Sequence, residues 1–195
     1  FSFSTPIDAI DQLLLAPNGK MLYMRSGSEL IVAIKHQNGY QVREVIDLNL
    51  TGVGQPVTKI YFLSGAYSLL VSYDDGLVVQ WFDVLTDGER NLTPIREFQL
   101  ATELELLLPD TFRKGFYSFY TNGTVQSHYT TSEKLVMFER AYKKAPILAA
   151  MSNNERYLVT LGDGRLTVAL VDNEHPEVSF SSLWDKVWYE SYPEP

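Results

Sequence analysis

Two acidic residues have a spacing that occurs in carbohydrate-cleaving enzymes. Glu103 and Glu105 lie two positions apart, so in a strand their side chains share one face. If that strand lined a central opening, the two carboxyl groups could form the acid and base pair of a glycosidase. A solvent-exposed strand rim gives the same spacing without any chemistry. We prefer this second interpretation, and we name no catalytic residue.

The other residue types that bind metals or act as nucleophiles are scattered or missing. His36, His128 and His175 are far apart and form no His-x3-His or His-Glu-x2-His motif, so we predict no metal site. The chain has no cysteine, no G-x-S-x-G motif and no Walker loop. We therefore predict no catalytic, cofactor-binding or metal-binding residue, and no cofactor.

Three short motifs that resemble functional sites are better explained as turns. Asp-Asp-Gly at 74–76 and Gly-Asp-Gly at 162–164 resemble pieces of calcium loops, but neither continues into the full loop pattern with a distal Glu. Asn122-Gly123-Thr124 matches a glycosylation sequon. Asp-Gly and Asn-Gly are also the dipeptides of tight hairpin turns. We expect hairpin turns at all three places.

Composition and charge describe a folded, acidic chain. Its 195 residues are 45% hydrophobic and 13% aromatic, enough to bury a core. The net charge of -8 and the pI of about 4.9 repel polyanions, so we expect no nucleic acid partner. No run approaches the roughly 18 apolar residues of a spanning helix. Because the chain begins at Phe1 without a signal peptide, we interpret it as a piece of a longer protein.

The same order of signals recurs four times along the chain: apolar run, polar turn, apolar run, glycine turn, apolar run. The glycines of the second turns are spaced 41 to 49 residues apart, and a repeat of this length points to an architecture built from equal units. The copies cover 13–35, 57–84, 104–130 and 147–172, and their turn glycines are Gly27, Gly76, Gly123 and Gly164.

Each copy is followed by a further strand-like segment, so each unit is predicted to be a meander of four short strands. These segments are 42–48, 95–100, 134–141 and 177–180 (EVSF). The inner strands are almost continuously apolar, which indicates that both of their faces are covered. The pattern favours an all-β fold, a β-propeller with four recognisable four-stranded blades. A β-sandwich is the alternative, although it gives no reason for a repeat.

The repeats resemble those of WD40 and related propeller families. The resemblance rests on LLLAPNGKMLYM at 13–24 and AAMSNNERYLVTLGDGRLTVALVD at 149–172. Trp81-Phe82-Asp83 stands where the family has Trp-Asp, whereas the family's Gly-His pair is absent. In the other copies the tryptophan position falls near Ala33, His128 and Ala169. The resemblance implies WD40-like propeller blades over residues 1–180.

Four blades are few for a closed propeller ring. We therefore expect the chain to be part of a larger propeller, whose other blades lie in the parent protein or come from a second copy. An open ring leaves apolar blade faces uncovered. For this reason we expect self-association of the chain.

Residues 181–195 depart from the repeat. Ser182 and Asp185 have the spacing of a capping box, which predicts a short amphipathic helix that ends before Pro193. Such a helix could dock on the propeller or connect it to another domain. The apolar side chains on one face of this helix would be Leu183, Trp184, Val187 and Trp188.

The sequence WDKVWYESYPEP at 184–195 resembles the segment that leads into the membrane domain of Pst-type phosphate ABC transporter permeases of gamma-proteobacteria. Those permeases carry a WD40-like insert between a first membrane helix and the permease helices. The resemblance implies a periplasmic domain of a membrane-anchored inner-membrane protein. It also implies a protein partner, such as the phosphate-binding protein or another transporter subunit.

Three functions remain open. The first is a non-catalytic propeller domain of a phosphate transporter permease, the second a cytosolic WD40-like scaffold, and the third a propeller enzyme with a site in its central channel. The tail segment favours the first. Basic residues are scattered, and Arg43-Glu44 and Arg96-Glu97 each place an acid beside the base, so we expect no capture of free phosphate.

Overall fold

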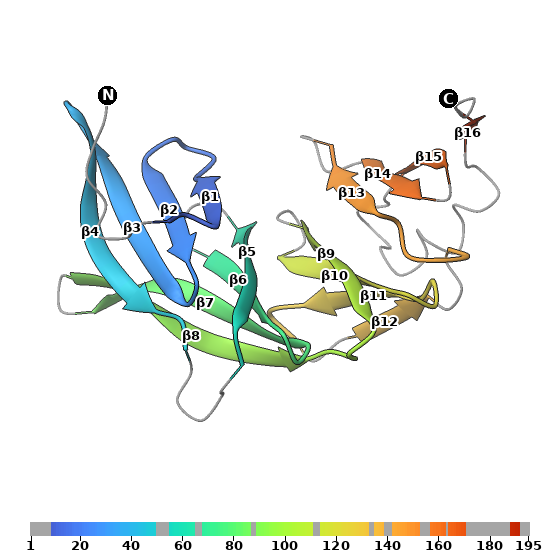
Figure 1. Ribbon diagram of the computed structural model, residues 1–195, viewed down its shortest axis with the longest axis horizontal. Helices are drawn as coiled ribbons and strands as arrows, with labels where there is room; N and C mark the ends of the chain where they lie inside the picture. The colour runs from blue at the N-terminus through green and yellow to red at the C-terminus, as the bar shows by residue number, and fades with distance from the viewer. Residues whose placement is uncertain are drawn as a thin grey trace. The chain divides into compact units, whose positions relative to one another are not determined.

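The described part of the chain consists of β-sheet. The computed structural model describes residues 9–49, 55–64, 68–86, 89–110, 114–132, 135–138, 142–152, 157–162, 164–170 and 188–191. These residues form four antiparallel sheets of four strands, and within each sheet the strands follow in sequence order (Figure 1). The chain divides into two compact units, Phe1–Leu100 and Ala101–Pro195, with two sheets in each. The predicted all-β organisation in four-stranded meanders is confirmed.

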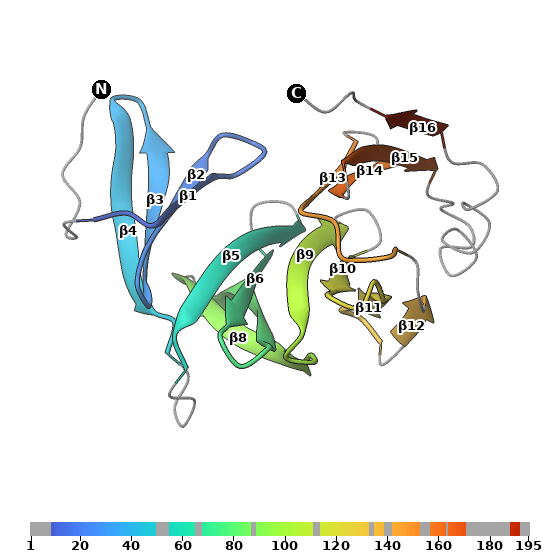
Figure 2. The ribbon, with the colours of Figure 1, turned by 45° about the vertical axis from the view of Figure 1, so that its right-hand side comes forward.

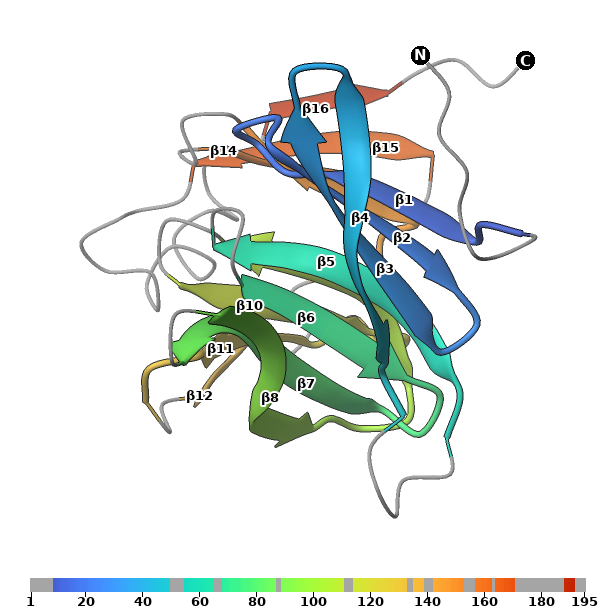
Figure 3. The same cartoon turned by 90° about the vertical axis from the view of Figure 1, so that its left-hand side faces the viewer.

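The first sheet of unit Phe1–Leu100 is buried mainly through its two middle strands. Its strands are β1 (Gln12–Leu15), β2 (Met21–Ser26), β3 (Glu29–His36) and β4 (Gly39–Asp47). β2 has mostly buried side chains and β3 has four consecutive buried ones, Leu30 to Ala33, whereas β1 and β4 mix half-buried with exposed ones. Figure 3 shows β4 along the outer edge of this sheet. The continuous apolar run in β3 is thus explained by burial on both faces.

The second sheet of this unit has a middle strand in which every side chain is buried. Its strands are β5 (Val57–Ser64), β6 (Ser68–Tyr73), β7 (Leu77–Thr86) and β8 (Glu89–Gln99), and Figure 3 shows them side by side. β6, with the sequence SLLVSY, is buried throughout. Apolar residues from this sheet and from β1–β4 form one cluster, in which Leu30 and Val32 join Ile60, Val71 and Trp81. The two sheets therefore share a core.

Unit Ala101–Pro195 repeats this arrangement with shorter strands. Its first sheet contains β9 (Leu104–Asp110), β10 (Gly115–Tyr120), β11 (Val125–Tyr129) and β12 (Leu135–Phe138). Its second sheet contains β13 (Leu148–Met151), β14 (Tyr157–Gly162), β15 (Arg165–Leu170) and β16 (Trp188–Ser191), drawn from orange to dark red in Figure 2. Tyr117, Phe119, Val125 and Leu158 form the buried core of this unit.

The turn glycines predicted from the repeat have the expected backbone conformation. Gly27, Gly76, Gly123 and Gly164 have φ values of 55°, 81°, 81° and 67°. Each lies between the second and third strands of its sheet, where a tight turn needs a residue without a Cβ. The hairpin prediction is confirmed in all four copies.

The positions matched to the family tryptophan are equivalent in the structure. Ala33 pairs with Leu22, Trp81 with Leu69, His128 with Phe116 and Ala169 with Leu158. In every case the matched residue lies in the third strand and its partner in the second. The alignment of the four copies is therefore structurally correct.

The end of the chain differs from the sequence-based expectation. Residues 188–191 form strand β16, which pairs with β15, so Trp188 does not belong to a helix and no helix runs on toward Pro193. Residues 181–187, where the rest of the helix was expected, lie outside the described residues. β16 is the fourth strand of this sheet, a place that we had assigned to 177–180, and residues 177–180 also lie outside the described residues. The sheet is completed by a segment that starts eight residues after 180.

Candidate functional site

The two acidic residues with glycosidase-like spacing occupy exposed positions. Glu103 lies in the turn before β9 and Glu105 lies within β9, next to a change of register in its pairing with β10 between Phe119 and Tyr120. Both carboxylate side chains are exposed. Their surroundings fit the strand-rim interpretation, because a catalytic acid of this type needs a desolvated site.

The histidines are not brought together. His36 is exposed at the end of β3 in the first unit, His128 is buried in β11 of the second unit, and His175 lies outside the described residues. Within the described ranges, no three His, Asp or Glu side chains gather closely enough to hold a metal ion.

The turn motifs form local hydrogen bonds that are typical of turns. In the Asp-Asp-Gly turn, the Leu77 N–H donates to Asp75 Oδ1 at 3.0 Å. In the Asn-Gly-Thr turn, the Thr124 N–H donates to Asn122 Oδ1 at 2.9 Å. In each turn one side-chain oxygen therefore accepts a backbone N–H, as is typical of Asx turns. Asp163 of the third motif lies outside the described residues.

A pocket of about 400 Å³ opens beside the Asn-Gly-Thr turn of unit Ala101–Pro195. The turn between β10 and β11 forms one side of it, and the residues before β9 and in β12 form the others. Its lining combines one carboxylate, two carboxamides, two hydroxyl groups and a thioether. These residues are Ala101, Glu103, Tyr120, Asn122, Thr124, Gln126 and Met137.

A chain of hydrogen bonds leads from a buried histidine to this pocket. His128 Nε2 lies 2.8 Å from Ser118 Oγ, which donates to the Tyr120 hydroxyl at 3.2 Å. The Tyr120 hydroxyl donates to Gln126 Oε1 at 2.8 Å. The four residues alternate along β10 and β11, so they lie on one face of the sheet. A buried position is thereby connected to the pocket wall.

The direction of this chain follows from its chemistry. Burial raises the pKa of the Tyr120 phenol, so the phenol keeps its proton and donates it to Gln126. Because the only Ser118 hydroxyl proton is directed at Tyr120, His128 Nε2 must carry a hydrogen and act as the donor. Gln126 Oε1 is then occupied as an acceptor. The amide nitrogen of Gln126 remains the group that the residue offers to the pocket.

His128 is held as a neutral ring. Its imidazole stacks on Phe116 with a centroid distance of 4.5 Å and an interplanar angle of 10°. Burial lowers the pKa of His128 to about 4, because the charged form would lose its hydration. At neutral pH the ring is therefore neutral, with Nε2 within hydrogen-bond distance of Ser118 Oγ.

Sequence reasoning did not identify Ser118, Tyr120 and Gln126 as members of a site. The signal for them is weak but real: polar residues alternate with the aromatic core residues Tyr117 and Phe119 along β10. Period-two alternation places them on the face opposite that core.

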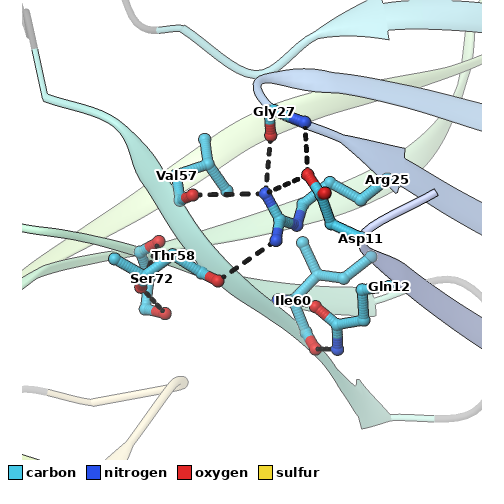
Figure 4. Close-up of polar contacts among 8 residues, drawn as sticks. All are labelled: Asp11, Gln12, Arg25, Gly27, Val57, Thr58, Ile60 and Ser72. Carbon is cyan, nitrogen blue, oxygen red and sulfur yellow. Dashed lines mark hydrogen bonds and ion pairs between the residues drawn. The ribbon is translucent and has the colours of Figure 1, made fainter. Parts of the chain in front are cut away.

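In unit Phe1–Leu100, a buried arginine connects the two sheets (Figure 4). Arg25, at the end of β2, donates from Nη1 to the carbonyl oxygens of Gly27 at 2.7 Å and Val57 at 3.2 Å. Its Nη2 donates to the carbonyl oxygen of Thr58 at 3.3 Å. Asp11 Oδ2 lies 3.6 Å from Nη1 and also accepts the Gly27 N–H at 2.7 Å. We call this group the Arg25 junction.

Two further contacts strengthen the link between these sheets. Gln12 in β1 forms two hydrogen bonds with the backbone of Ile60 in β5, one as donor at 2.6 Å and one as acceptor at 2.8 Å. Arg43 in β4 donates to the buried Asp83 of β7 at 3.2 Å and also pairs with Glu44. Asp83 belongs to the Trp-Phe-Asp motif, so that motif contributes an inter-sheet ion pair.

Apolar side chains are exposed on edge strands of the sheets. Leu13 and Leu15 lie on one face of β1 and are 59% and 55% exposed. Leu148 in β13 and Met137 in β12 are also exposed. Pairs of exposed leucines on one strand face are a feature that protein contacts commonly cover.

Comparison with known proteins identifies the fold but no closer relative. Neither a protein-family model nor a curated protein sequence matches the chain significantly. Among solved structures, the WD40 domain of SCAP from fission yeast matches with a TM-score of 0.60 and 12% identity, over 95% of this chain and 42% of that one. The fission yeast SREBP-SCAP binding domains match with a TM-score of 0.61 and 10% identity, over 95% and 49%. The fold is that of part of a β-propeller.

A third structure supports the same conclusion. A candidate 6-phosphogluconolactonase from Bacteroides fragilis matches with a TM-score of 0.59 and 13% identity, over 85% of this chain and 51% of that one. The chain thus spans about half the length of the propellers that it matches. The WD40-like part of the sequence resemblance is confirmed as a fold, and the β-sandwich is set aside. None of these structures links the chain to a phosphate transporter.

The described residues of this propeller portion contain no helix of the length and apolarity needed to cross a membrane.

Proposed function

We propose that this chain is a non-catalytic propeller domain whose surface binds a protein partner. The observation that carries this proposal is the pair of exposed leucines on β1, Leu13 and Leu15, which are more than half exposed on one strand face. Exposed apolar groups on a rigid sheet lose hydration on contact and need no rearrangement of the backbone, which favours protein binding.

Several observations support a binding role over a catalytic one. The two acidic residues with enzyme-like spacing, Glu103 and Glu105, are both exposed. The buried His128 is occupied by Ser118 and by stacking on Phe116. The two carboxylates thus lack the desolvation of a catalytic acid, and the imidazole of His128 already contacts groups of its own sheet.

At a finer level, we assign the chain to the periplasmic part of a Pst-type phosphate ABC transporter permease of the inner membrane. This assignment is supported by the sequence of residues 184–195 and by its place directly after WD40-like repeats. The partner would be the phosphate-binding protein or another transporter subunit. A long apolar run directly after Pro195 in the parent protein would support the assignment, and a soluble domain there would contradict it.

The acidity of the chain predicts that it does not capture phosphate itself. A small dianion needs fixed donors, whereas this chain carries a net charge of -8. We expect calorimetric titration with phosphate to give no saturable heat, and titration with the transporter's phosphate-binding protein to give saturable binding. Saturable phosphate binding at micromolar concentration would contradict the proposal, as would silence with the binding protein and every other transporter subunit.

A further inference from the structure

The pocket beside the β10–β11 turn is lined by groups of three chemical kinds. Two of its lining residues carry carboxamide NH₂ groups, one carries a negative charge, and two present apolar surface. These three features restrict the chemistry of the ligand that would fit.

The donors are the side-chain amide nitrogens of Asn122 and Gln126. Asn122 Oδ1 already accepts the Thr124 N–H, and Gln126 Oε1 already accepts the Tyr120 hydroxyl. Each carboxamide oxygen therefore accepts one hydrogen bond within the protein, whereas within the described residues neither NH₂ group donates to the protein, so both remain available as donors. Gln126 is held most firmly, because the chain from His128 fixes its orientation. The pocket thus recognises acceptors such as carbonyl oxygens.

The negative charge comes from Glu103. Its carboxylate is exposed, it lines the pocket, and its field acts on the Tyr120 phenol, although burial is the larger cause of that group's raised pKa. Among the described residues, Glu103 forms no ion pair. A cation in the ligand would fill this place.

The apolar surface comes from Met137 and Ala101. Met137 in β12 is 50% exposed at the pocket wall. A thioether adapts its shape to aliphatic chains, so it suits the methylene groups that carry an ammonium or guanidinium head.

We propose that this pocket binds a peptide segment of a partner protein that carries a lysine or arginine. Glu103 pairs with the cationic head, Met137 packs against its aliphatic stem, and the amide groups of Asn122 and Gln126 donate to carbonyl oxygens of the peptide backbone. The inference rests on the proposed function in one respect, that the ligand belongs to a protein, and it adds the chemistry of the segment that is bound.

The net charge of the whole chain also favours a cationic ligand. A net charge of -8 raises the local concentration of cationic segments and speeds their association. The same charge disfavours an anionic ligand, even though two amide donors alone would tolerate one. The negative charge of Glu103 therefore favours a ligand with a positive charge.

The test is a nuclear magnetic resonance titration of the full, isotope-labelled chain. The probes are acetyl-Ala-Arg-Ala-amide and an analogue with norleucine in place of arginine. We expect saturable shifts of the backbone amides in the 120–126 region with the arginine peptide, at affinities on the order of millimolar. The norleucine peptide should not saturate. Equal shifts with both peptides, or none with either, would overturn the proposal.

Matched variants separate the pocket from general acidity. Glu103→Gln should weaken binding of the arginine peptide about three- to fivefold, as expected for loss of a solvent-exposed ion pair. Glu105→Gln removes the same charge two residues away, from a side chain that does not line the pocket, and should change affinity by less than about twofold. Equal effects of the two variants would show a diffuse charge effect and refute the site.

The same variants distinguish this inference from the proposed function. If the chain binds a transporter subunit and Glu103→Gln has no effect on that binding or on the peptide, the pocket assignment is wrong while the proposed function stands. If the arginine peptide binds but no transporter subunit does, the pocket assignment stands and the transporter assignment is wrong.

Discussion

Gly123 shows how a single residue can be required for two reasons. Its φ is 81°, and a Cβ at this position would lie against the carbonyl of Tyr142, whose backbone N–H donates to the Gly123 oxygen at 3.0 Å. We expect Gly123→Ala to lower the free energy of unfolding by roughly 3 kcal/mol or more, because strain and clash add. Urea denaturation measures this change.

Gly164 is the matched control for that substitution. Its φ is 67°, but a Cβ there would meet no atom within 4 Å. Gly164→Ala should therefore cost only the strain of the left-handed conformation, about 1 kcal/mol. If both variants lose the same stability, the contact with Tyr142 contributes nothing.

His128 should make the stability of the chain depend on pH. Its pKa is lowered by burial to about 4, whereas an unfolded histidine titrates near 6.5. The unfolded chain therefore binds a proton below 6.5 that the folded chain does not bind until about 4. The free energy of unfolding should fall by up to about 3 kcal/mol as the pH drops across this window.

A variant that keeps the donor but does not titrate isolates this effect. His128→Gln retains an N–H for Ser118 and loses the stacking on Phe116, so it should be less stable at every pH. Its denaturation curves at pH 7.5 and 4.5 should differ less than those of the wild type. If the two proteins respond identically to pH, His128 is not the titrating group.

At the residue scale, the sequence predicts conformation better than it predicts the site. The turn glycines were recognisable because a positive φ is a property of one residue and its neighbours. Ser118, Tyr120 and Gln126 were not, because their role depends on a partner strand and on a shared face. Cross-strand neighbours are set by register, which the sequence of one strand does not contain.

At the scale of elements, the Arg25 junction should be a major support of unit Phe1–Leu100. Its guanidinium reaches three carbonyl oxygens, two of them in β5, from a side chain that is 10% exposed. We expect Arg25→Met to destabilise the unit by about 2 kcal/mol, because the buried carbonyl oxygen of Val57 and the partly buried ones of Gly27 and Thr58 lose their charged donor. Chemical denaturation followed by tryptophan fluorescence measures the loss.

Two companion variants test the geometry of the junction. Arg25→Lys keeps the charge but has a single nitrogen and cannot reach the same set of carbonyl oxygens, so it should recover less than half of the loss. Asp11→Asn should cost only about 1 kcal/mol, since Asp11 is 48% exposed. A lysine variant as stable as the wild type would show that the fork geometry is unimportant.

Prediction of elements succeeded where turn signals bounded them and failed at the last strand. WDKVWYES at 184–191 has apolar residues at helical spacing, which predicted a helix where residues 188–191 form β16, whereas EVSF at 177–180 lies outside the described residues. Pairing with the edge of β15 determines which segment completes the sheet. That choice is tertiary, and propensity is only a weak guide to it.

At the scale of the whole molecule, the chain should self-associate through its exposed apolar strand faces. It spans about half of the propellers that it matches, and Leu13 and Leu15 are exposed on β1. We expect the mass measured by light scattering to rise with concentration. Leu13→Glu should shift this rise to higher concentration. A chain that stays monomeric at the highest accessible concentration contradicts the prediction.

The control for this variant carries the same added charge elsewhere. Gln41→Glu places a carboxylate at an exposed polar position of β4 and should leave association unchanged. If both variants reduce association equally, net charge rather than the β1 surface governs it.

The overall architecture was easier to predict than the site or the last strand, because four copies of the repeat each show the same pattern of strands and turns. One degenerate copy, such as the third with His128 at the tryptophan position, would be ambiguous alone. Four copies with turn glycines at similar intervals identify the repeat even where a single copy departs from the family pattern. The partner was not predictable in this way, because fold and function are separable.

The Arg25 junction has a consequence for the response of the molecule to ionic strength. Most of its bonds join a buried guanidinium to neutral carbonyl oxygens, and only Asp11, half in solvent, contributes a second charge. Dissolved ions screen exposed charge pairs, but they have little access to a buried bond between a charge and a dipole. The two sheets should therefore stay joined from dilute buffer to molar salt, while the surface field of the acidic chain disappears over the same range.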